Sequence, residues 1–257
     1  MSMFQSGEVY AELPAELAGR LEIKTKDITG STNLDIKALA EAGAPEGTVM
    51  IAGEQTAGRG RLGRSFYSPR DGGLYMSVLL RPELTAADSL AVTVCAASAA
   101  ACAIEDLTGR KTGIKWVNDI YIDGRKVVGI LTEASVADEA RIIYAVMGIG
   151  INVTDKGFPE ELRDKAGTTG GGEGLRPKLA AAVLDRFFGY YDRLPDKGYM
   201  AEYRSRSILT GKMIEYERGG ELFTARAVGI DDDAGLIVIT PQGGELHLGS
   251  GEVQIKM

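Results

Sequence analysis

Glycine and arginine alternate in one short stretch of an otherwise acidic chain. Residues 58–64 hold three arginines and three glycines in seven positions. Glycine lets backbone N–H groups approach a ligand closely, and the forked guanidinium groups of Arg59, Arg61 and Arg64 can bind phosphate or carboxylate in a bidentate manner. A solvated turn with exposed arginines is the alternative, but ordering such a loop costs conformational entropy that a bound ligand would offset. The sequence favours an anion-binding loop.

Two nucleotide-binding motifs match the letters of this loop but not its context. Residues 58–63 fit G-x-G-x-x-G, and residues 58–65 nearly fit the phosphate loop G-x-x-x-x-G-K-S, with Arg64 in the lysine position. Each motif requires a strand that leads directly into a helix whose N-terminus faces the phosphate. Here a stretch with proline and glycines follows, and then an apolar run typical of a strand. We therefore expect neither of the two motifs.

A hairpin over residues 113–134 supplies a second polar group. Asp123-Gly124 is a dipeptide that favours a type I′ turn, and such a turn sets Ile122 opposite Arg125, Tyr121 opposite Lys126, and Asn118 opposite Gly129. One face would carry Lys115, Asp119, Tyr121 and Lys126, and the other Ile114, Trp116, Ile120, Val127 and Leu131. The pattern leaves open whether the polar face meets solvent or lines a cleft.

The remaining elements predict an α+β fold. Helices are expected over residues 31–43, 85–109 and 176–194, and buried strands over 47–55, 72–82 and 141–153. From residue 209 the chain changes to short strands with turn signals at 219–220, 231–235 and 243–244. We expect a mixed sheet with flanking helices over residues 1–208 and a small SH3-like β-barrel over residues 209–257.

Composition excludes several classes of protein and site. The chain of 257 residues is 44% hydrophobic and has a net charge of −7, which argues against general nucleic-acid binding. Cys95 and Cys102 are expected to be buried reduced thiols, and His247, the single histidine, an exposed strand residue. No signal peptide and no apolar run of roughly 20 residues is evident, so we expect a cytoplasmic protein without a membrane partner.

Four motifs in register resemble the bacterial biotin protein ligases. They are S-T-N at 31–33, E-Q-T-A-G-R-G-R-L-G-R at 54–64, K-W-V-N-D-I-Y-I-D-G-R-K-V-V-G-I-L-T-E at 115–133 and G-I-G-I-N at 148–152. The resemblance extends from about residue 25 to the end and implies a class II synthetase-like catalytic domain. It also implies the family's reaction, in which biotin and ATP form biotinyl-5′-AMP and the biotinyl group then passes to a lysine of a biotin carboxyl carrier domain.

The resemblance also implies roles for individual residues. Biotin would be bound by Ser31, Thr32, Asn33, Gln55, Gly58, Arg59, Gly60, Arg61, Lys126 and Gly129. ATP would be bound by Arg61, Arg64, Phe66, Asn118, Lys126 and Asn152. Catalysis would rest on Lys126, Arg59, Arg61 and Asp119, the last beside the reacting phosphate or its Mg²⁺, whose protein ligands stay open. Val117 and Phe66 stand where the family often has proline and tryptophan.

Two alternatives stay open at this point. One is a lipoate- or octanoate-type acyl ligase or transferase of the same fold, and the other is a non-enzymatic module whose barrel and basic loop bind RNA. Some family members begin with a DNA-binding winged helix-turn-helix and act as repressors. We expect the form without that domain and without a repressor role. A homodimer is a further possibility.

Overall fold

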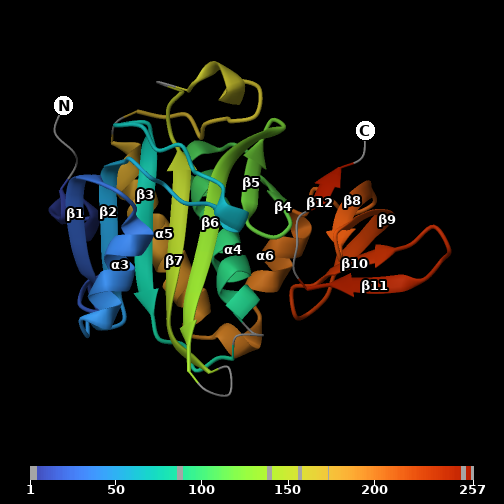
Figure 1. Ribbon diagram of the computed structural model, residues 1–257. Coiled ribbons are helices and arrows are strands. Elements are labelled where there is room, and N and C mark those ends of the chain that lie inside the picture. The colour runs from blue at the N-terminus through green and yellow to red at the C-terminus, as the bar shows by residue number, and fades with distance from the viewer. Residues whose placement is uncertain are drawn as a thin grey trace.

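A seven-stranded mixed sheet forms the frame of the protein (Figure 1). The computed structural model describes residues 5–85, 89–137, 141–155, 158–172, 174–249 and 253–255. The strands are β1 (Glu22–Thr29), β2 (Thr48–Gln55), β3 (Gly73–Leu80), β4 (Gly113–Lys115), β5 (Asp119–Ile122), β6 (Arg125–Val136) and β7 (Ile142–Asn152). They are ordered β1-β2-β3-β7-β6-β5-β4, with β1 parallel to β2 and every other neighbouring pair antiparallel. The predicted mixed sheet is confirmed.

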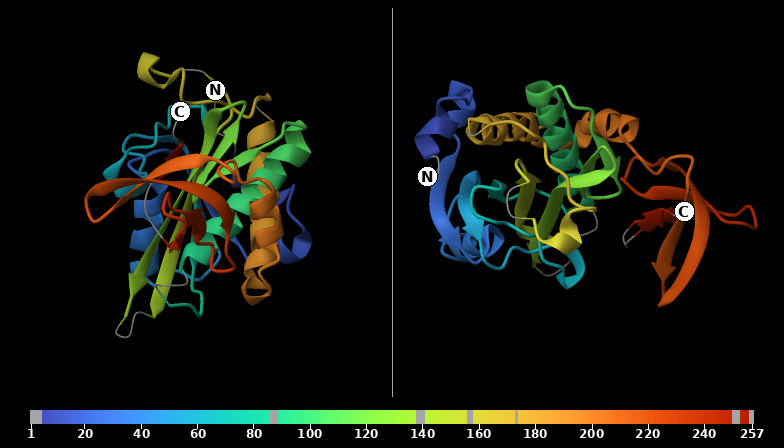
Figure 2. Two further views of the ribbon diagram at one scale, coloured as in Figure 1. Left: turned by 90° about the vertical axis from the view of Figure 1, so that its right-hand side faces the viewer. Right: turned by 90° about the horizontal axis from the view of Figure 1, so that it is seen from above.

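Helices cover both faces of this sheet (Figure 2). They are α1 (Ser6–Tyr10), α2 (Ala15–Ala18), α3 (Thr32–Glu41), α4 (Leu90–Thr108), α5 (Leu175–Tyr191) and α6 (Tyr199–Ser205), with single 3-10 turns at Arg61–Gly63, Glu160–Leu162 and Leu194–Asp196. The larger core lies between the sheet and α4 and α5. A smaller core, which includes Ile36, Leu79 and Tyr144, lies under α3 on the opposite face. Since strand side chains alternate between faces, both cores share the same strands.

The observed helix ends follow local signals. Ser31 stands at the N-cap of α3 in extended conformation, but its hydroxyl makes no capping hydrogen bond, although the residue type favours one. Helix α4 ends at Gly109, which has a left-handed φ of 68° that suits glycine. Its predicted start at residue 85 is not observed, because α4 begins at Leu90, and residues 86–88 lie outside the described ones. Helix α5 stops at Tyr191, and the 3-10 turn at Leu194–Asp196 takes up the predicted last residue.

Helix α4 is the core helix of the larger layer. By length and composition alone it could cross a membrane, but 72% of its apolar window is buried inside the protein. Both cysteines lie on this helix as buried free thiols, as predicted. Burial raises the pKa of the Cys95 thiol, so this group stays protonated. We therefore interpret α4 as a structural helix that packs against one face of the sheet.

The C-terminal residues form a separate antiparallel sheet (Figure 1, red). Its strands are β8 (Met213–Arg218), β9 (Glu221–Ile230), β10 (Leu236–Ile239), β11 (Glu245–Leu248) and β12 (Val253–Ile255), ordered β11-β10-β9-β8-β12. The predicted C-terminal β unit is confirmed, and among the described residues it is open, because no pairing of β11 with β12 closes a barrel. His247 lies exposed on β11, as predicted. The exact boundary at 208–209 stays a prediction.

The hairpin register is predicted correctly at the turn and wrongly beyond it. Asp123 and Gly124 both have positive φ, as a type I′ turn requires, and Tyr121 pairs with Lys126. The register then shifts, since Val127 is an extra residue on β6, and Gly129 faces Asp119 in place of Asn118. The bulge therefore sets Gly129 opposite Asp119. Leu131, expected on the apolar side, is half-buried and lines the cavity described below.

Candidate active site

One cavity gathers most of the residues that the sequence singled out. It has a volume of about 120 Å³ and lies between the arginine-rich loop and strands β5 and β6. Among the residues predicted to bind ligand or act in catalysis, its lining includes Arg59, Gly60, Arg61, Arg64, Phe66, Asn118, Asp119, Lys126 and Gly129. Lys115, Asp119 and Lys126 of the predicted polar face line this cleft, whereas Tyr121 does not, and Trp116 of the predicted apolar face does. Val253 of β12 also lines it, and no signal in the sequence marked this contribution of the C-terminal sheet.

The arginine-rich loop folds on itself and reaches the sheet through two side chains. Arg59 Nη2 lies 3.1 Å from Glu133 Oε1, and Arg61 Nη1 donates to Asn118 Oδ1 at 3.1 Å. The backbone N–H of Phe66 donates to the carbonyl of Gly58 at 2.9 Å. A Cβ atom at Gly58 would lie 2.4 Å from the carbonyl oxygen of Phe66, so only glycine fits there. A strand follows at β3, and the two rejected motifs are indeed absent from this context.

Lys126 and Asp119 form the charged centre of the cavity. Lys126 Nζ lies 2.7 Å from Asp119 Oδ1, and both side chains are partly accessible to solvent. Asp119 lies two residues before Tyr121 on β5, and Tyr121 pairs with Lys126, so the two charged groups share one face of the hairpin. A lysine held by one carboxylate and open to a cavity can bind a second anion. This pair therefore offers both a fixed cation and a potential proton acceptor at one point.

The ring of Phe66 packs against Gly129 on β6 and Gly150 on β7, which we call the floor of glycines. A Cβ atom at Gly150 would lie 2.4 Å from Phe66 Cε1, and one at Gly129 would lie 3.0 Å from Phe66 Cε2. Any side chain at Gly150 would therefore collide with the ring. Gly148 serves a neighbouring contact, since its Cβ would lie 2.0 Å from Asn33 Oδ1. The spacing of glycines in residues 148–152 thus fits two side chains that approach the sheet from the loop and from α3.

A polar network beside these glycines connects three of the predicted site residues, Thr32, Asn33 and Gln55. Thr32 N–H donates to Gln55 Oε1 at 2.9 Å, and Gln55 Nε2 donates to the hydroxyl of Ser68 at 2.9 Å. Ser77 Oγ lies 2.7 Å from Thr32 Oγ1 and 2.6 Å from Asn33 Oδ1. Ser31, Thr32 and Asn33 are buried and Gln55 partly so, and none of the four lines the cavity.

Three residues of the network escaped the sequence analysis. Ser68, Ser77 and Glu133 hold the predicted site residues in place. Ser77 is a polar residue in the fully buried strand β3, a signal that could have identified it. Asn152, by contrast, has a different partner: its Nδ2 donates to the carbonyl of Gly167 at 3.1 Å, and it does not line the cavity.

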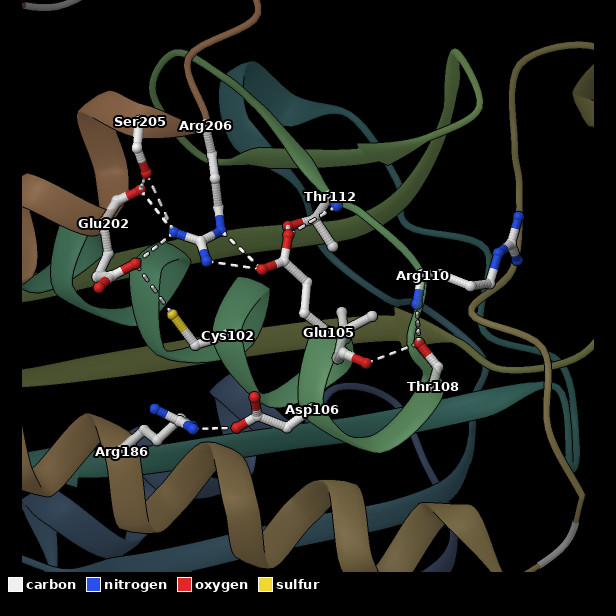
Figure 3. Close-up of polar contacts among 11 residues, drawn as sticks. Cys102, Glu105, Asp106, Thr108, Arg110, Thr112, Arg186, Glu202, Ser205 and Arg206 are labelled. Atoms are coloured by element: carbon white, nitrogen blue, oxygen red, sulfur yellow. Dashed lines mark hydrogen bonds and ion pairs between the residues drawn. The ribbon is translucent and has the colours of Figure 1, made fainter.

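A second cluster fixes the segment that leads into the site (Figure 3). The backbone N–H and hydroxyl of Thr112 donate to Glu105 Oε1 at 2.9 and 2.8 Å, and Arg206 donates to Glu105 Oε2 at 2.6 Å. Burial alone would raise the pKa of Glu105, but the hydrogen bonds from Arg206 and Thr112 outweigh it and lower that pKa. The backbone of Arg206 also accepts from Ile114 N–H at 2.7 Å. Together these contacts anchor β4 to α4 and α6.

Comparisons with known proteins identify the family of this chain. Residues 25–152 match the biotin/lipoate A/B protein ligase family. The bifunctional ligase/repressor BirA of Bacillus spizizenii is 35% identical over 92% of this chain and 74% of its own length. The biotin–[acetyl-CoA-carboxylase] ligase of Mycobacterium tuberculosis is 32% identical over 86% of each chain.

The fold is also shared with a solved ligase. The biotin protein ligase of Aquifex aeolicus, in complex with biotin and ATP, is 28% identical and has a TM-score of 0.76, over 91% of this chain and 99% of its own. The resemblance expected from the four sequence motifs is thereby confirmed. The chain belongs to the biotin/lipoate A/B protein ligase family, and within it to the biotin protein ligases.

Proposed function

We propose that the protein activates biotin with ATP and transfers the biotinyl group to a lysine of a biotin carboxyl carrier domain. In the first step a biotin carboxylate oxygen attacks the α-phosphorus, the bond to the β-phosphate oxygen breaks, and pyrophosphate leaves. In the second step the lysine amine attacks the biotinyl carbonyl, AMP leaves, and the amine loses a proton. The observation that carries this proposal is the convergence of Lys126 with Arg59, Arg61 and Arg64 on one cavity.

Charge neutralisation is the main physical demand of the first step. A carboxylate and a phosphate that meet at about 4 Å repel each other by about 4 kcal/mol at an effective dielectric of 20. Lys126 lies where both anions could be reached, and the loop arginines supply further positive charge. Catalysis of this kind depends on positioning and electrostatic stabilisation more than on covalent chemistry by the protein.

The roles expected from the resemblance assign biotin and the nucleotide to different residues of the site. We propose that biotin binds against Thr32, Asn33 and Gln55, and that the nucleotide binds near Arg64 and Asn118. A cavity of about 120 Å³ is smaller than the roughly 300–1,000 Å³ of typical small-molecule sites. The loop, and Phe66 with it, must therefore move to admit both substrates and can close over the reactive anhydride afterwards.

Mg²⁺ fits this site mainly as a companion of the nucleotide. Within the described ranges, no three acidic, histidine or cysteine side chains gather to hold a metal. Asp119 is the carboxylate that lines the cavity, and Mg²⁺ is commonly bound by one or two carboxylates together with substrate phosphates. Asp119 is therefore the residue that would contact the ion, which would supply charge neutralisation of the phosphates. In the second step the same carboxylate could accept the proton of the amine.

The direct test is transfer to a carrier. The protein, a biotin carboxyl carrier domain, biotin, ATP and Mg²⁺ are incubated, and the carrier mass is measured. We expect an increase by one biotinyl group that is lost when the acceptor lysine of the carrier is changed to arginine. Replacing biotin by lipoate or octanoate tests the alternative of the same fold. A carrier modified by lipoate or octanoate, and not by biotin, would overturn the proposal.

The cellular setting belongs to the same proposal. We place the enzyme in the cytoplasm, where carboxylase carriers are made, and assign it no role in binding DNA. The net charge of −7 supports the second point, because a DNA-binding surface needs a basic excess. An electrophoretic mobility assay over a range of salt concentrations would test it, and salt-sensitive retardation of DNA would contradict it. Homodimer formation stays a prediction, open to sedimentation analysis.

A further inference from the structure

Glu133 on β6 connects the two halves of the site. Its Oε1 lies 3.1 Å from Arg59 Nη2 of the loop, and its Oε2 accepts a hydrogen bond from Asn33 Nδ2 at 2.8 Å. Asn33 is buried, so the carboxylate meets the end of a buried network while its other oxygen faces the loop. None of the roles implied by the family resemblance falls on Glu133.

Two acceptors orient the amide of Asn33, since its Nδ2 donates to Glu133 Oε2 at 2.8 Å and, at a longer 3.4 Å, to the backbone carbonyl of Leu131. An ionised carboxylate only accepts hydrogen bonds, so the NH₂ group of Asn33 must face Glu133 and its carbonyl oxygen must face Ser77. The 2.6 Å contact between Ser77 Oγ and Asn33 Oδ1 then requires the single hydroxyl proton of Ser77. Ser77 consequently has no proton left to donate elsewhere.

The contact between Ser77 and Thr32 also depends on which of the two hydroxyl groups donates the proton. Ser77 Oγ lies 2.7 Å from Thr32 Oγ1, and a contact of that length between two oxygens needs a proton between them. Because the Ser77 proton is already committed, the Thr32 hydroxyl must supply it. Gln55 Oε1 is the other possible acceptor of the Thr32 hydroxyl proton. Its contact with Thr32 Oγ1 is longer, at 3.1 Å, and Gln55 Oε1 already accepts from Thr32 N–H at 2.9 Å, so the proton goes to Ser77. The Thr32 oxygen is left as an acceptor.

We propose that Glu133 is a positioning residue that makes the proposed biotin seat selective for a ring bearing N–H donors. Through Asn33 and Ser77 it directs the Thr32 proton away from the ligand, so that Thr32 Oγ1 accepts from a ureido N–H. Its second oxygen holds Arg59 at the edge of the seat. An acyl chain with a dithiolane or plain alkyl end has no N–H and leaves this acceptor unpaired, which costs binding. The inference rests on the proposed function.

The test compares two glutamates that each pair with an arginine of the loop region. Glu133→Gln removes the charge that strengthens the hydrogen bond from Asn33 and pairs with Arg59. The control is Glu54→Gln, because Glu54 Oε2 lies 3.4 Å from Arg70 Nε at the base of the loop, outside the network. Steady-state formation of biotinyl-AMP is measured with biotin, with an analogue methylated at one ureido nitrogen, and with varied ATP. The Tm of each variant is recorded alongside.

We expect Glu133→Gln to raise the KM for biotin about tenfold or more, as for the loss of one hydrogen bond to a charged group. The KM for ATP should stay within about twofold, and the preference for biotin over the methylated analogue should shrink. Glu54→Gln should behave as the parent. Equal biotin KM values for the two variants, or a parallel rise for biotin and ATP, would overturn the inference.

A second variant keeps the outcome decisive if Glu133→Gln does not fold. Ser77→Ala removes the connecting hydroxyl but leaves Glu133 beside Arg59, and it should also raise the biotin KM while sparing ATP. An unchanged biotin KM would overturn the inference. Failure of the parent protein to form any biotinyl-AMP would count against the proposed function itself, whereas a parent that forms it with an unaffected Glu133→Gln variant would count only against the role of Glu133.

Discussion

The two sides of the site are built in different ways. On the seat side, Thr32, Asn33 and Ser77 are buried and joined by hydrogen bonds on α3 and the sheet. On the loop side, Arg59 and its partner Glu133 have side chains 45% and 36% exposed, and exposed ion pairs contribute about 0–1 kcal/mol. We therefore assign recognition of the ring to rigid elements, and the charge neutralisation that the arginines add to that of Lys126 on β6 to a loop that can leave the sheet at little cost. The following predictions test this division.

The largest expected effect is on chemistry at Lys126. Lys126→Ala should reduce biotinyl-AMP formation by about 10²–10³-fold, because it removes the cation between the two reacting anions. The Tm should change little, since the Lys126 side chain is 34% exposed. Single-turnover kinetics measures the first quantity and differential scanning calorimetry the second. Lys165→Ala, an exposed lysine outside the cavity, is the control. Full activity of the Lys126 variant would show that this residue of the hairpin is not needed for the reaction.

The floor of glycines should be sensitive to a single methyl group. Gly150→Ala would place Cβ 2.4 Å from the Phe66 ring, and overpacking of this kind typically costs about 1–3 kcal/mol of unfolding free energy. Adding Phe66→Ala should restore part of the loss, because the ring that collides is gone. Urea denaturation of the single and double variants measures this coupling. Additive losses would show that Phe66 does not rest on the floor.

Loosening the loop should release the intermediate without unfolding the protein. Arg61→Gly removes the hydrogen bond to Asn118 Oδ1 at 3.1 Å and adds backbone freedom. Free biotinyl-AMP should escape about tenfold faster, in line with one hydrogen bond from a charged donor. Rapid filtration with labelled biotin gives the escape rate, and circular dichroism checks the fold. Equal retention by variant and parent would argue that Arg61 does not close the loop.

The smallest effect concerns pH and the cluster that anchors β4. The pKa of Glu105 is lowered in the folded protein, so its stabilising contribution is present above the unfolded pKa of about 4.3 and is lost as pH falls through the lower folded value. Unfolding free energy should therefore decline in acid, and Arg206→Met should flatten that decline. Denaturation between about pH 3 and 7 tests this. An unaltered acid profile in Arg206→Met would exclude Arg206 as the cause.

Much of the frame could be predicted from local signals. The Asp123-Gly124 turn, the C-terminal strands and the buried cysteines follow from residue type and spacing. The shift in the β6 register could not, because a bulge at Val127 depends on what packs on both faces of the strand. Local patterns fix where elements form, whereas tertiary packing decides such details.

The site was predictable in its charged half only. Arg59, Arg61 and Lys126 carry an evident chemistry, and the structure brings them together. Ser77 and Glu133 act through other side chains, so their role becomes clear only when the fold brings Asn33 of α3 to β3 and β6. Of the predicted biotin residues, Thr32, Asn33 and Gln55 are gathered in the polar network and do not line the cavity.

The central claim is that these cations join a carboxylate to the α-phosphate of ATP. The most direct measurement is mass spectrometry of the small molecules formed when the protein, biotin, ATP and Mg²⁺ react without a carrier. We predict biotinyl-AMP and pyrophosphate in equal amounts, with no product when biotin is replaced by octanoate. Formation of octanoyl-AMP in place of biotinyl-AMP, or of no acyl adenylate at all, would contradict the account.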